Sequence, residues 1–116
     1  MNNVNIMGRI ATDLTLRPVR RSAGVVVNFK IAVDRYAGGN KFTDFIRCTA
    51  WGKTAERICN YLSKGNMIAV SGSLTTGDYV ARKGIRRNTT DVLVREFYFT
   101  DDKYRRNDDL DGFEEI

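Results

Sequence analysis

The run from Thr43 to Trp51 alternates between two kinds of side chain, and no other stretch restricts the fold as strongly. In an extended strand, successive side chains point to opposite sides of the sheet, so every second residue shares a face. One face would carry Phe45, Arg47, Thr49 and Trp51, and the other Asp44, Ile46, Cys48 and Ala50. The second set, apart from Asp44, suits a protein core, whereas a core accepts Arg47 only if it is paired. We therefore expect a half-buried strand whose outer face combines aromatic rings with a cation.

Such an outer face is well suited to unpaired bases. Each base stacked on an aromatic ring contributes about 1 to 3 kcal/mol, and an arginine adds cation–π attraction. A duplex hides the faces of its bases, so a single strand is the natural ligand. The alternative is that Phe45 and Trp51 are core residues, as most strand aromatics are, but their shared face with Arg47 disfavours it. Stacking by itself does not distinguish DNA from RNA.

The charge of the chain is unevenly distributed. Residues 1–100 hold 16 basic and 7 acidic side chains, a net charge of +9, whereas residues 101–116 hold 3 and 7, a net charge of −4. A basic body fits a polyanionic partner and simple solubility equally well on charge alone, and the interleaved aromatics favour nucleic acid. At 116 residues the chain suits one domain. We expect a folded domain over residues 1–100 and a disordered acidic tail over residues 101–116.

Several classes of function are disfavoured by composition. The chain has no His, and Cys48 and Cys59 stand apart, so zinc binding and most imidazole-based catalysis are unfavourable. We expect no metal and no cofactor, with both cysteines reduced in the core. The first ten residues lack the pattern of a secretory signal, and the aliphatic runs are too short to span a bilayer. We therefore expect no membrane association and a cytoplasmic location.

The order of the expected elements indicates the fold. Strands are expected over residues 4–10, 25–33 and 43–51, a helix over 53–62, and strands over 67–74 and 89–100. Three strands, a helix and two further strands match an oligonucleotide-binding (OB) fold, an all-β, five-stranded barrel with one short helix between strands 3 and 4. This fold binds its ligands on the face of strands 2 and 3 and in the loops between strands 1 and 2 and between strands 4 and 5.

Cationic residues cluster in both of those loops. Arg17, Arg20 and Arg21 fall between strands 1 and 2, and Arg82, Lys83, Arg86 and Arg87 fall between strands 4 and 5. For the first group, phosphate contact and a solvated loop are equally good interpretations. For the second, phosphate contact is modestly favoured, although exposed loops attract charge in any case. Tyr79 follows the fourth strand beside the second group, which favours a stacking role.

Six segments together carry a resemblance to a known family. They are NVNIMGR (3–9), VNFKIAV (27–33), TDFIRCTAWGKTAE (43–56), YLSKG (61–65), GSLTT (72–76) and TTDVLV (89–94). Over nearly all of residues 1–100 the chain resembles the bacterial and phage single-stranded DNA-binding proteins. The resemblance implies that Phe45, Trp51, Tyr79 and Tyr36 stack bases and that Lys30 and Arg47 face the bound strand. It also implies a homotetramer, with first strands paired between subunits, that acts in DNA replication, recombination and repair in a bacterial cell or phage-infected host.

The end of the chain departs from that family. Family members often carry a long linker and an acidic tip that closes on Pro-Phe and docks partner proteins. Here the linker is nearly absent, and the sequence ends in DDLDGFEEI. By resemblance, a tail contact with replication and recombination proteins would involve Asp108, Asp109, Leu110, Asp111, Phe113 and Ile116.

The leading hypothesis is a non-enzymatic protein that binds single-stranded DNA with little sequence preference. The alternative is an OB-fold adaptor of the replication-restart type, which uses the same barrel mainly to join protein partners. A barrel-fold nuclease would need clustered acidic residues to hold a metal or activate water. The body has only scattered acids such as Asp34, Asp44 and Asp78, so catalysis is not expected.

Overall fold

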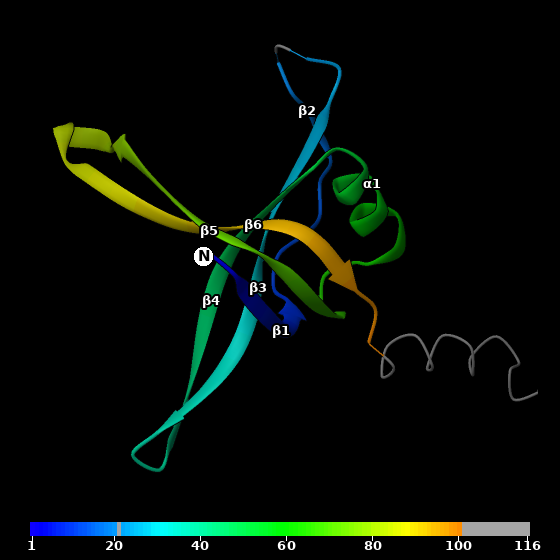
Figure 1. Cartoon of the computed structure of the whole chain (residues 1–116). Helices are drawn as coiled ribbons and strands as arrows, with labels where there is room; N and C mark the ends of the chain where they lie inside the picture. Colours follow the sequence, from blue (N-terminus) through cyan, green and yellow to red (C-terminus); the bar gives the residue numbers. More distant parts are fainter. Residues whose placement is uncertain (21, 101–116) are drawn as a thin grey trace, which may run out of the picture.

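The computed structural model describes residues 1–20 and 22–100. The elements are β1 (Val4–Ile10), β2 (Arg17–Pro18), β3 (Val25–Ala37), β4 (Asn40–Trp51), α1 (Gly52–Tyr61), β5 (Met67–Val80), the 3-10 turn η1 (Arg82–Gly84) and β6 (Arg86–Tyr98). The predicted all-β architecture is confirmed (Figure 1). The helix α1 lies between β4 and β5, which are the third and fourth long strands because β2 has only two residues.

The five long strands close into a barrel. The sheet order is β1-β5-β6-β4-β3-β2, and β3 returns to β1 through the pairs Arg9–Ala32 and Ile10–Ile31. These contacts are antiparallel except that between β4 and β6, which is parallel and limited to Cys48–Val92 and Thr49–Leu93. The short parallel contact is therefore the seam at which β4 meets β6 and the barrel is completed.

The core is built from alternate positions of the strands and one side of α1. Its buried strand residues include Val27, Phe29 and Ile31 of β3, Cys48 and Ala50 of β4, Ile68 and Val70 of β5, and Val92 and Val94 of β6. Ala55, Ile58 and Leu62, which recur at helical spacing, join the same cluster. The alternation expected for a strand with one buried face is confirmed for β3 and β4.

Two long hairpins extend from the barrel as arms (Figure 1). In the first arm, β3 and β4 stay paired as far as Ala37–Asn40. The two residues between them, Gly38 and Gly39, have φ angles of 59° and 82°, a region that favours glycine and matches the twist of a two-residue hairpin. In the second arm, β5 and β6 stay paired as far as Val80–Arg86. Both arms thus carry side chains well beyond the core.

The expected tail over residues 101–116 lies outside the described residues, so its predicted disorder stays a prediction. Within the part of the chain that the structure describes, the helix is too short to cross a membrane.

Candidate nucleic-acid interface

The outward side chains of β3 and β4 form one face, which we call the platform. It consists of Asn28, Lys30, Ala32, Phe45, Arg47, Thr49 and Trp51. Lys30 lies opposite Arg47, Ala32 opposite Phe45, and Asn28 opposite Thr49. Phe45 and Trp51 are 59% and 50% exposed, so neither ring fills the barrel. The structure therefore brings two open aromatic rings and two cations onto one surface.

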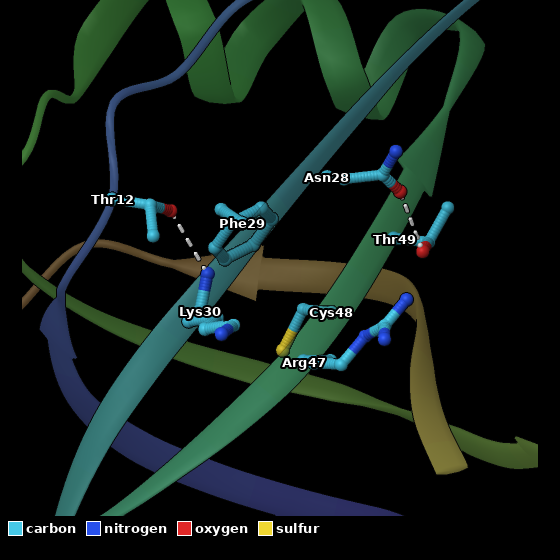
Figure 2. A pocket seen from close by; sticks show the side chains of 7 residues that line it. All are labelled: Thr12, Asn28, Phe29, Lys30, Arg47, Cys48 and Thr49. Carbon is cyan, nitrogen blue, oxygen red and sulfur yellow. Dashed lines mark hydrogen bonds between the residues drawn. The ribbon is translucent and has the colours of Figure 1, made fainter. Parts of the chain in front are cut away.

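A pocket of about 220 Å³ opens in the middle of the platform. Figure 2 shows its lining, which is Thr12, Asn28, Phe29, Lys30, Arg47, Cys48 and Thr49. Thr49 Oγ1 donates a hydrogen bond of 2.9 Å to Asn28 Oδ1, and the Lys30 backbone N–H donates one of 3.1 Å to Thr12 Oγ1. The NH₂ group of the same Asn28 amide remains available as a hydrogen-bond donor. Together with the two cations, it makes the pocket rich in donors and suited to phosphates and base carbonyls.

Arg47 is paired with an acid that the sequence did not single out. Its Nε lies 3.0 Å from Oδ1 of Asp91 on β6, across the seam where β4 and β6 meet. Arg47 thus lies on the outer face of the sheet, as predicted, and it is paired there as well. The same acid affects the neighbouring thiol: burial, with the negative charge of Asp91, raises the pKa of Cys48 to about 12. Cys48 therefore stays a neutral thiol at physiological pH, and both cysteines are free.

The first arm extends the platform to Tyr36 and Lys41. These residues are direct cross-strand partners, and alternation places them on the same side as Lys30 and Phe45. Tyr36 is 73% exposed, more than either platform ring. Sequence reasoning named Tyr36 but missed Lys41, although Lys41 lies four residues before Phe45 and so has the same parity. A base stacked on Tyr36 would have an ammonium group beside it.

The opposite side of this arm is held by a cluster of three side chains. Arg35 donates to Asp44 twice, from Nε at 2.9 Å and from Nη2 at 3.3 Å, and its guanidinium lies 5.0 Å from the centre of the Phe42 ring. The hydrogen bond from Arg35 lowers the pKa of Asp44. This explains Asp44, the one residue that did not suit a core: it lies where the strand has left the barrel. We call this cluster the arm clasp.

The second arm carries Tyr79 and four cations. Tyr79, 51% exposed, is the cross-strand partner of Arg87, and alternation along β6 places both on the side of Asp91. Arg86 points to the other side, where its Nη1 lies 3.6 Å from Oδ2 of Asp78. Arg82 and Lys83 occupy the tip, in η1. The placement of Arg86 and Arg87 in a loop was wrong, because the β5–β6 ladder continues as far as Arg86.

The cations between the first and second long strands are less well gathered. Arg17 lies in β2, which pairs with the start of β3, and Arg20 is exposed in the loop that follows. Arg21 lies outside the described residues, as do the tail positions Asp108, Asp109, Leu110, Asp111, Phe113 and Ile116. Among the residues that the structure does describe, no cluster of three or more His, Cys, Asp or Glu side chains could hold a metal ion.

Comparison with known proteins identifies the family. The single-strand binding protein family matches residues 1–100. A single-stranded DNA-binding protein of Clostridium perfringens is 46% identical over 101 residues, which cover 87% of this chain and 67% of that protein. One of Clostridium tetani is 36% identical over 115 residues, covering 97% of this chain and 79% of that protein. Single-stranded DNA-binding protein 2 of Clostridium acetobutylicum is 39% identical over 101 residues, which cover 85% of this chain and 76% of that protein. With a barrel of the expected topology and a match over the whole of it, the chain belongs to the single-strand binding protein family.

Proposed function

We propose that this protein binds single-stranded DNA with little sequence preference and without catalysis. The observation that carries the proposal is the platform, where Phe45 and Trp51 are open to solvent beside Lys30 and Arg47. Every base has an aromatic face, so stacking accepts any sequence, while cations near the backbone release the counterions of the phosphates. Tyr36 and Tyr79 would extend the stacking surface along the two arms. Arg87, Arg82, Lys83, Arg86, Arg17, Arg20 and Arg21 would add phosphate contacts.

The fluorescence of Trp51 tests this proposal directly. It is the only tryptophan of the chain and lies at the end of the platform. Addition of oligo-dT should quench its emission, and a hairpin-free duplex of the same length should change it little. The oligo-dT affinity should also fall as NaCl rises. An emission that ignores oligo-dT at low salt would contradict the platform as the binding surface.

We further propose that the protein protects single-stranded DNA during replication, recombination and repair, in the cytoplasm of a bacterial cell or phage-infected host. The support is family membership and the bacterial origin of its relatives. The alternative, a replication-restart adaptor acting mainly through protein partners, is not favoured. The preference rests on the family match and on relatives that are named single-stranded DNA-binding proteins.

A homotetramer is the proposed assembly, with β1 strands paired between subunits. β1 pairs with β5 from Val4 to Arg9 but with β3 only at Arg9 and Ile10, so its other edge has room for a strand along most of its length. Such an edge is a template for a second copy. Met7, on the same strand, is 59% exposed. Light scattering of the purified chain should give a mass near four times 13.2 kDa. A monomer mass at micromolar concentration would reject this assembly.

The acidic tail is proposed to dock partner proteins of replication and recombination. In the sequence, its acidic residues are neighbours of the apolar residues Leu110, Phe113 and Ile116. We treat residues 1–100 as the DNA-binding domain and residues 101–116 as the partner-binding segment.

A further inference from the structure

Three charged side chains lie in a row across three adjacent strands, two on the platform and one on β6 beside it. Lys30 of β3 lies directly opposite Arg47 of β4, and Arg47 in turn contacts Asp91 of β6. Like charges placed directly opposite each other destabilise a sheet. Asp91 lies on the far side of Arg47 from Lys30, where it offsets that repulsion.

The two platform cations, Lys30 and Arg47, differ in whether a carboxylate neutralises their charge. Arg47 is 54% exposed and is held at 3.0 Å by Asp91, whose side chain is only 22% exposed. The Asp91 Oδ1 atom is shielded from solvent and accepts no hydrogen bond from residues 1–20 or 22–100, so Arg47 is what compensates its charge. Lys30 has no carboxylate partner within those same ranges. One platform cation is therefore neutralised before any ligand arrives, and the other is not.

This difference matters because the salt dependence of DNA binding counts only cations that neutralise phosphates. For single strands, the slope of log K against log salt changes by about 0.7 for each phosphate neutralised. An arginine that keeps its carboxylate adds no net charge to the complex. Its planar guanidinium can still stack on a base and donate hydrogen bonds to base carbonyls.

We infer that Asp91 gives the two platform cations different roles. Arg47, whose charge Asp91 neutralises, contacts bases, whereas Lys30 binds phosphate. Asp91 is thus a positioning residue that acts through Arg47. The inference rests on the proposed binding of single-stranded DNA. Without the Asp91 carboxylate, Arg47 becomes an additional phosphate-binding cation.

The test is the salt dependence of oligo-dT binding for the wild-type chain and four variants. Lys30→Gln should make the slope shallower by about 0.7 per protomer engaged. Arg47→Lys, which keeps the positive charge beside Asp91 but lacks the planar guanidinium, should weaken binding by about 2- to 30-fold at every salt concentration and leave the slope unchanged. Asp91→Asn should steepen the slope by about 0.7 and tighten binding at low salt. The double variant Arg47→Gln/Asp91→Asn is the matched control and should have the wild-type slope, because neither partner remains.

A purely structural role for Asp91 predicts a different outcome. An ion pair that only joins β4 to β6 would lower the melting temperature of Asp91→Asn and leave its salt slope at the wild-type value, which would overturn the inference. An Arg47→Lys variant that binds oligo-dT as tightly as the wild type would also overturn it, and this comparison decides the matter even if Asp91→Asn does not fold. A wild-type chain that fails to bind oligo-dT at any salt concentration would instead reject the proposed function.

Discussion

Where β3 and β4 enclose the core, position parity separates the aromatic side chain that fills the barrel from those that face outward. Phe29 is 3% exposed and belongs to the core, while Phe45 lies on the platform. The two residues have the same chemistry and differ only in the face of the strand they occupy. Tyr61 provides a contrast elsewhere, since it is an exposed ring on α1 that packs edge-on against Phe99 at 5.8 Å.

Replacement of a platform ring should therefore weaken DNA binding without unfolding the chain. For Phe45→Ala we expect a loss of about 1 to 3 kcal/mol in oligo-dT binding, because one stacked base loses its support. The measurement is a titration followed by anisotropy of a labelled oligonucleotide. Tyr61→Ala is the control: it removes an equally exposed ring from α1 and should leave the affinity unchanged. Equal losses in both variants would show that exposure alone, and not the platform, determines the effect.

The buried thiol of Cys48 predicts a pH dependence of stability. The pKa of this thiol in the fold is about 12, against an ordinary value of 9.0. The unfolded chain therefore loses this proton first, so the stabilisation is complete below pH 9 and is lost as the pH rises toward 12. Between pH 9 and 10.5 the free energy of unfolding should fall by about 1.5 kcal/mol more in the wild type than in Cys48→Ala. Urea denaturation at each pH provides the two curves; parallel curves would contradict the assigned environment of Cys48.

At the scale of the elements, the arms show how hairpins can carry a binding surface beyond a small core. The first arm has few buried residues, so it depends on its ladder, its two-glycine turn and the arm clasp. Thr43 Oγ1 also donates to Asp34 Oδ1 at 3.1 Å on the opposite side from the clasp. The arm is thus held on both sides, which keeps Tyr36 and Lys41 in line with the platform.

Loss of the clasp should loosen the first arm selectively. In Asp44→Asn, amide hydrogen exchange over residues 34–43 should become a few-fold faster, because the charge that holds Arg35 is gone. The pKa of Asp44 is lowered, so in the wild type the clasp should persist below the usual pKa of an aspartate and open as the pH falls through the lowered value. Asp78→Asn, which removes the acid paired with Arg86 in the second arm, should not alter exchange in the first. Uniform exchange changes in both variants would argue against a local clasp.

Two glycines of β5 offer a matched test of close packing between strands. A Cβ atom at Gly72 would collide with the backbone oxygen of Leu93, beside the register shift at Ser71–Gly72. One at Gly77 would meet only the Thr89 Oγ1 atom, at 3.3 Å. Gly72→Ala should destabilise the fold by about 1 to 3 kcal/mol or more, since the β5–β6 ladder must shift. Gly77→Ala should change stability by less than about 1 kcal/mol. Thermal melts followed by circular dichroism give both values, and similar melting temperatures would contradict the close approach at Gly72.

For the whole molecule, the main feature is the separation of charge between body and tail. Residues 1–100 carry a net charge of +9 and residues 101–116 carry −4. A negative segment joined to a basic, DNA-binding body can compete with the phosphates of a ligand, and salt screens such competition.

Deletion of residues 101–116 should therefore tighten oligo-dT binding at low salt, with a difference that shrinks as NaCl rises. A full-length variant with its seven tail acids changed to Asn or Gln should behave like the deletion, since it removes charge and keeps length. Filter binding at about 20 mM and about 500 mM NaCl would provide the comparison. The Debye length is about 20 Å at the lower concentration and about 4 Å at the higher. Unchanged affinity in both variants at low salt would reject competition and leave partner docking as the role of the tail.

Local geometry determined much of this protein from its sequence alone. The outward placement of Phe45, Arg47 and Trp51 follows from the two-residue repeat of an extended strand, and the helical spacing of Ala55 and Ile58 located α1 within one residue. The order of three strands, a helix and two strands predicted the barrel by its match to a known fold, since the apolar face of a sheet can be covered in more than one way.

Only the tertiary structure decided which charges meet. Arg47 and Asp91 are far apart along the chain, and they touch because two register pairs join β4 to β6 at the seam of the barrel. Arg86 and Arg87 take opposite sides because the ladder with β5 extends to them, and Asp44 is tolerated because its strand has left the core before reaching the arm clasp. Side-chain alternation is a property of a single strand, whereas strand length, register and closure depend on partners that no local pattern specifies.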